Sequence, residues 1–153
     1  MVNNITDIKR LREYGCEDSM ASKVLIKLLN NVQVYVPDEK ISIVYPKRLF
    51  GNTTDKIWDE TDLEIVLLTT DDQIIITSLA DDQGFVINIY DKSEIASIVI
   101  TGNITEYDHQ VSPSAILRFK DGNDLILDSA EDANEYWVKG YTTAITSIIK
   151  QLL

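Results

Sequence analysis

The spacing of apolar residues changes twice along this chain. In residues 1–31 they recur every three or four positions on either side of Gly15, as on one face of a helix. In residues 32–128 they alternate with polar residues in short runs, which is typical of strands. Helical spacing returns in residues 129–153. The pattern therefore predicts a single domain with an N-terminal helical segment, a β-sheet region and a C-terminal helix.

The alternating runs are separated by short links rich in Asp, Asn and Gly, which tolerate the backbone angles of turns. Links this short favour antiparallel neighbours over parallel strands joined by crossover helices. The first two runs, on either side of Pro37, are expected to form a hairpin. The predicted strands cover residues 32–36, 41–45, 63–69, 73–78, 85–90, 95–101, 115–119 and 124–128.

The last segment carries a wide apolar stripe at helical spacing. We expect this helix to begin near Ser129 and to bury the stripe against the sheet, so the fold class is α+β. The stripe consists of Trp137, Tyr141, Ile145, Ile148 and Leu152.

Two short phrases in residues 63–153 resemble bacterial pleckstrin-homology-like (PH-like) and GRAM-like domains, several families of which have no assigned function. One phrase opens a strand with Ile95, Ser97 and Ile98, and the other places Phe119 before a turn at residues 121–122. The resemblance implies a strongly bent antiparallel sheet of seven strands, or partly open barrel, capped by a C-terminal helix. It also implies a non-enzymatic module that binds a protein or peptide at a sheet edge or beside the helix.

Lipid-binding members of that group carry a basic loop between the first two strands of the matched region. This chain has Asp71 and Asp72 in the corresponding link, residues 69–73. Two carboxylates there would repel an inositol phosphate, so we expect no phosphoinositide binding.

The charge balance narrows the choice of partner. The chain has 14 basic and 25 acidic residues and a net charge of −11, and residues 31–153 hold 9 of the basic and 21 of the acidic ones. Such a surface repels nucleic acid and anionic membranes, so we expect neither as a partner. A basic protein or peptide is the expected partner, and the oligomeric state stays open.

Catalytic, metal and cofactor chemistry find little support in the sequence. His109 is the lone histidine and Cys16 the lone cysteine, and six scattered glycines form no phosphate-binding loop. We therefore expect no enzyme activity and no cofactor. A single cysteine, with no signal peptide and no run of about 20 apolar residues, predicts a cytoplasmic protein.

One local feature suggests a binding site. Trp58 is followed by Asp59 and Glu60, and an aromatic residue beside carboxylates suits the capture of a basic partner. The alternative is a loop tryptophan folded back over the sheet. A second hypothesis for the whole chain is an acidic protein of the immunity or antitoxin type that neutralises a basic toxin. A third is a barrel that carries a small apolar ligand.

Overall fold

The computed structural model of the 153-residue chain describes residues 6–15, 20–50, 58–81, 84–102 and 113–153. Its α-helices are α1 (Ile8–Tyr14), α2 (Met20–Gln33), α3 (Ser129–Asp132) and α4 (Val138–Leu152), and its single-turn 3-10 helices are η1 (Asp38–Lys40), η2 (Glu60–Asp62) and η3 (Lys92–Glu94). The strands are β1 (Ile41–Lys47), β2 (Glu64–Thr69), β3 (Gln73–Leu79), β4 (Phe85–Asp91), β5 (Ile95–Thr101), β6 (Ser114–Phe119) and β7 (Asp124–Asp128).

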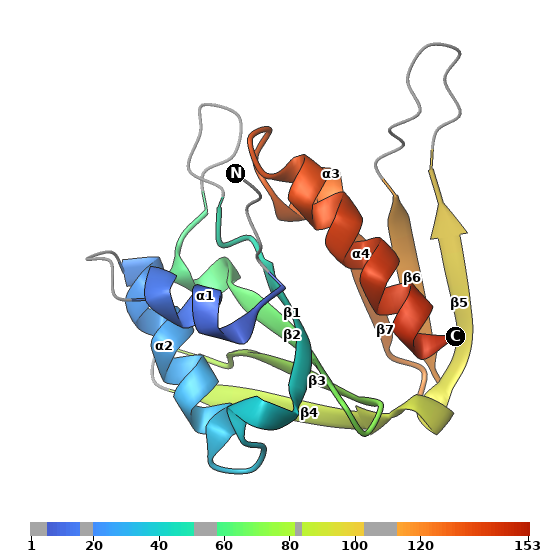
Figure 1. Cartoon of the computed structure of the whole chain (residues 1–153), viewed down its shortest axis with the longest axis horizontal. Helices are drawn as coiled ribbons and strands as arrows, with labels where there is room; N and C mark the ends of the chain where they lie inside the picture. Colours follow the sequence, from blue (N-terminus) through green and yellow to red (C-terminus); the bar gives the residue numbers. More distant parts are fainter. Residues whose placement is uncertain (1–5, 16–19, 51–57, 82–83, 103–112) are drawn as a thin grey trace.

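The strands form two antiparallel sheets. The first sheet has the order β1-β2-β3-β4 and the second sheet has the order β5-β6-β7. Figure 1 shows the two sheets splayed apart, with α4 lying between them and α1 and α2 on the far side of the first sheet. The predicted α+β class is confirmed, whereas no closed barrel forms among the described strands.

The central strand β2 of the first sheet is covered on both faces, which explains its continuous apolar run. Val66 and Leu68 point into the cluster that includes α4 and the second sheet. Ile65 and Leu67 point the other way, into the cluster formed with α1 and α2. A strand with two buried faces loses the alternation of apolar and polar residues, and β2 accordingly reads Glu-Ile-Val-Leu-Leu-Thr.

The second sheet is covered on one face only. Leu117 and Leu127 are fully buried beneath α4, while Arg118 and Ile126 on the opposite face are exposed. Burial alternates along β6 and β7, as expected for a sheet with one solvated face.

The predicted stripe on the C-terminal helix is core. Tyr141, Ile145, Ile148 and Leu152 are buried, and Trp137 is half-buried at the start of α4. The closing segment begins at Ser129 as expected, but the prediction of one continuous helix is wrong.

The break between α3 and α4 has a backbone cause. Ala133 adopts extended angles, and the Asn134 N–H donates to the carbonyl of Phe50 instead of continuing the helical ladder. Asp132, the last residue before the break, is buried.

The predicted hairpin of residues 32–36 with residues 41–45 is also wrong. Helix α2 runs through Val32, which is buried four residues after Leu28 in the cluster under the first sheet. The N–H groups of Tyr35 and Val36 then bond the Val32 carbonyl and end the helix. The 3.6-residue period that buries Val32 therefore prevails over the local alternation, and only β1 forms.

We expect Ile145→Asp to lower the free energy of unfolding by more than about 3 kcal/mol, because it buries an unpaired carboxylate. The matched control is Thr146→Asp, at an exposed position on the same helix. Urea denaturation followed by circular dichroism measures both. Equal stabilities for the two variants would contradict the packing of α4 described above.

Candidate functional site

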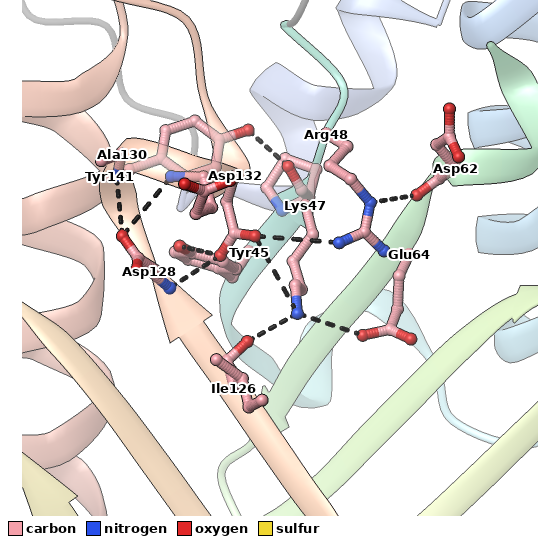
Figure 2. Close-up of polar contacts among 12 residues, drawn as sticks. Tyr45, Lys47, Arg48, Asp62, Glu64, Ile126, Asp128, Ala130, Asp132 and Tyr141 are labelled. Atoms are coloured by element: carbon pink, nitrogen blue, oxygen red, sulfur yellow. Dashed lines mark hydrogen bonds and ion pairs between the residues drawn. The ribbon is translucent and has the colours of Figure 1, made fainter. Parts of the chain in front are cut away.

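The most buried acidic side chain of the described chain joins the two sheets. The side chain of Asp132 is 3% exposed and lies where β1 approaches the end of β7. Its Oδ2 accepts a 2.7 Å hydrogen bond from the Tyr45 hydroxyl and a 2.9 Å bond from the Asp128 N–H. One carboxylate thus binds a strand of the first sheet and the last strand of the second sheet (Figure 2).

Two cations complete this arrangement. The Lys47 ammonium and the Arg48 guanidinium each lie 3.9 Å from Asp132 Oδ1. Lys47, 8% exposed, also lies 3.6 Å from Glu64 and donates a 2.5 Å bond to the carbonyl of Ile126 on β7. We call Tyr45, Lys47, Arg48 and Asp132 the corner clasp.

The corner clasp closes the β1–β7 corner with side chains instead of a backbone ladder. β1 and β7 are edge strands of different sheets and do not pair. The Arg48 N–H donates to the Asp132 carbonyl at 2.8 Å, and its Nε donates to the Asp62 carbonyl at 2.6 Å. Arg48 holds a left-handed backbone with φ of 64° immediately after β1 ends.

Burial dominates the protonation of the corner clasp. It raises the pKa of Asp132 above the ordinary value of 3.8, against the opposing effect of Lys47. It also raises the pKa of Tyr45, and the neighbouring Asp132 raises it further. The phenol therefore stays protonated and donates, and the groups are paired with one another. This pairing suits a structural role.

An open groove lies between β5 and the end of α4. Its volume is about 400 Å³, within the range of ligand sites in proteins. Figure 1 shows the two elements converging near the C-terminus of the chain. The lining residues are Lys92 of η3, Ile95, Ala96, Ser97 and Ile98 of β5, and Leu152 with the following Leu153.

The backbone of β5 has a free edge beside this groove. The Phe119 N–H bonds the Asn123 carbonyl, so odd residues of β6 bond β7 and even residues bond β5. In the β5–β6 register, the even residues of β6 lie opposite Ser97, Val99 and Thr101. Ile98 and Ile100 therefore direct their N–H and C=O groups away from β6, and no other described strand pairs with them.

Acidic residues lie at both ends of η3, the 3-10 helix whose Lys92 lines the groove. Asp91 and Glu94 are exposed at the two ends of η3, and the Glu94 carbonyl accepts a bond from the Lys120 N–H. Asp121, in the neighbouring turn, accepts a 2.8 Å bond from the Tyr90 hydroxyl. Hydrogen bonds from the Ser93 backbone lower the pKa of Asp91, which is fully ionised at neutral pH.

The residues predicted as a binding site lie elsewhere. Trp58 is half-buried and Asp59 is exposed, but Asp59 caps η2 by accepting from the Thr61 N–H, while Glu60 opens that helix. Hydrogen bonds from Thr61 lower the pKa of Asp59. η2 packs against α2, on the face of the first sheet opposite α4, so these residues are not part of the groove.

The link at residues 69–73 joins β2 to β3, which are the first two strands of the region that resembles PH-like domains. Asp71 there is exposed and lies 3.6 Å from Lys40. Cys16 and His109 fall outside the described residues.

No group of three or more His, Cys, Asp or Glu side chains in the described part of the chain could hold a metal ion. None of its helices is long and apolar enough to cross a membrane. Comparison with protein-family models, with curated proteins and with solved structures finds no match for the chain.

The sequence suggested binding at a sheet edge or beside the helix, but it named none of the residues of the groove and did not predict the corner clasp. The groove joins residues 92–98 to residues 152–153, and the corner clasp joins Tyr45 to a residue 87 positions later. The one available signal was the isolated pair Lys47-Arg48 at the end of a strand in an acidic chain.

We expect the stability difference between the wild type and Asp132→Asn to fall as pH rises from about 4. The folded protein holds the Asp132 proton more tightly than the unfolded chain, since its pKa is raised. The stability that the Asp132 carboxyl contributes is therefore fully present below its ordinary pKa. This stability is lost as pH rises through the pKa of Asp132 in the folded protein. Urea denaturation at a series of pH values gives the two free energies.

The control is Asp91→Asn, because the pKa of Asp91 is lowered. Its wild-type side chain contributes stability above the ordinary pKa and loses it as pH falls, so the two slopes should have opposite signs. A wild-type advantage over Asp132→Asn that grows with pH would show that the ion pairs outweigh burial.

Proposed function

We propose that this chain is a non-enzymatic PH-like interaction module that binds an extended protein segment in the groove between β5 and α4. The observation that carries the proposal is the free backbone edge of β5 lying directly beside that groove. An added strand gains backbone hydrogen bonds at the edge, while its side chains gain contact in the groove.

The geometry defines how such a segment binds. Ile98 and Ile100 offer four backbone groups to it, two N–H donors and two carbonyl acceptors. Alternate side chains of the segment point toward α4, where Ile95, Ile98 and Leu152 offer apolar contact. A segment with an apolar residue at that position fits best.

Charge selects the residues that flank this apolar position. Asp91 and Glu94 lie on either side of Lys92, the residue of η3 that lines the groove, and the whole chain carries −11. A basic residue near η3 is therefore favoured, and the association rate should fall as salt rises.

The architecture supports the PH-like part of the proposal. Four and three antiparallel strands in two sheets, followed by a helix packed between them, agree with the bent seven-stranded arrangement that the resemblance implies. The phrase at Ile95, Ser97 and Ile98 lies in β5, and three of its positions line the groove.

Selection from a library of random peptides displayed on phage tests this function, with affinities of the selected peptides measured by fluorescence anisotropy. We expect selected peptides to be extended, basic and apolar. Ala96→Arg should weaken their binding at least tenfold, because it fills the groove from an exposed position. Methylating alternate backbone nitrogens of a peptide should weaken binding by a similar factor.

Thr146→Arg, at an exposed position of α4 that does not line the groove, is the matched control for added charge. Trp58→Ala tests the surface proposed from the sequence. Selected peptides that tolerate Ala96→Arg but lose affinity with Trp58→Ala would refute the groove and favour the acidic surface at η2.

A further inference from the structure

β4 is the second long edge strand left open. It spans seven residues at the side of the first sheet opposite β1, and no other described strand pairs with its outer edge. Figure 1 shows it along the lower border of the molecule. Open edges of this length attract other strands unless charges, prolines or bulges protect them.

The outward backbone groups of β4 belong to its odd-numbered residues. The Ala80 N–H bonds the Gly84 carbonyl, and the Lys92 N–H bonds the Asp72 carbonyl, so even residues pair with β3 along the whole strand. Phe85, Ile87 and Ile89 therefore present their N–H and C=O groups to solvent.

The same three residues carry an apolar row on one face. Phe85 is 48% exposed and Ile89 is 47% exposed, while Ile87 packs partly against the cluster beneath α2. Residues 84–90 contain no charge and no proline. The edge thus lacks the charges and prolines that usually prevent pairing. The residues whose backbone groups are free to pair are also the residues that form the apolar row.

We propose that a second copy of this chain pairs its β4 antiparallel to this β4, with the twofold axis at Ile87. Ile87 then lies opposite Ile87 of the second copy, and Phe85 lies opposite Ile89 of the second copy. The three apolar residues of each copy meet one another, and each pair exchanges two backbone hydrogen bonds. The first sheet of one copy and the first sheet of the other then form one continuous sheet of eight strands.

The register follows from self-complementarity. Antiparallel pairing keeps facing residues on the same face of the sheet, so the apolar row of one copy can face only the same row of the other. Shifting the axis to Ile89 would place Asp91 opposite Ile87, and shifting it to Phe85 would leave Ile87 and Ile89 without apolar partners on β4.

The charged residues near the two ends of β4 favour the same register. Lys92 of each copy comes beside the β3–β4 turn of the second copy, and that turn carries Asp81. The central residues bring no like charges together, although each whole chain carries −11. Salt should therefore strengthen the dimer by screening the overall repulsion.

The size of the contact sets its strength. Seven paired residues extend over about 24 Å, which gives an interface at or below the small end of stable protein interfaces. We therefore expect a reversible dimer that dissociates at low micromolar concentration. Apart from Lys92, the residues that line the groove belong to β5 and the end of the chain, and they take no part in this pairing.

Sedimentation velocity of the full chain over a hundredfold range of concentration, at low and high sodium chloride, tests the proposal. We expect the average mass to rise with concentration, and more steeply at high salt. Ile89→Lys and Phe85→Lys should each shift the dissociation constant at least tenfold upward. Ile126→Lys on β7 and Ile100→Lys on β5 should leave it unchanged, as similarly exposed controls.

Disulfide trapping tests the register in a Cys16→Ser background. Val86 of one copy faces Asn88 of the other as a non-hydrogen-bonded pair with Cα atoms about 4.5 Å apart, which a disulfide can bridge. A mixture of Val86→Cys and Asn88→Cys proteins should form more cross-linked dimer than either alone. A monomer at every concentration, a dimer indifferent to both lysine variants, or no gain on mixing would each overturn the proposal.

Discussion

The structure depends on one buried carboxylate. Asp132 binds the hydroxyl of Tyr45 on the first sheet and the backbone of Asp128 on the second, and it lies near two cations from the end of β1. Without it, the buried Lys47 ammonium and the buried Tyr45 phenol would lose the partner that they share. Asp132 is the last residue of α3, and the break between α3 and α4 comes directly after it.

The two edge strands of the first sheet, β1 and β4, therefore differ in their contacts. At β1, side chains take the place of backbone pairing with another strand, since the Lys47 ammonium donates a hydrogen bond to the Ile126 carbonyl of β7. At the other end, β4 leads through η3 into β5, and the outer edges of both strands remain free. Residues buried in the corner clasp stabilise the fold, whereas the surfaces that can recognise another chain lie at these open edges.

The sequence predicted much of the β region because its signals are local. Turn residues and alternation placed β2 to β7 within a residue or two, and the stripe on α4 identified its buried face. The hairpin at residues 32–36 was mispredicted because Val32 and Val36 fit a period of two as well as a helical period of four. Only packing against the first sheet distinguishes the two periods.

The candidate sites were harder to predict for a different reason. Asp132 looked like one more acidic residue near a helix start, and its partner Tyr45 lies 87 residues earlier. The groove needs β5 beside the end of α4, a contact that no local pattern encodes. In contrast, Trp58 and Asp59 were conspicuous in the sequence, yet Asp59 is engaged in capping η2.

A double-mutant cycle between Tyr45 and Asp132 tests the central role of the corner clasp most directly. The free energies of unfolding of the wild type, Tyr45→Phe, Asp132→Asn and the double variant give the coupling energy. A hydrogen bond from a buried phenol to a carboxylate predicts a coupling of about 1.5–3 kcal/mol. Additive effects, with a coupling near zero, would contradict the conclusion that this contact holds the two sheets together.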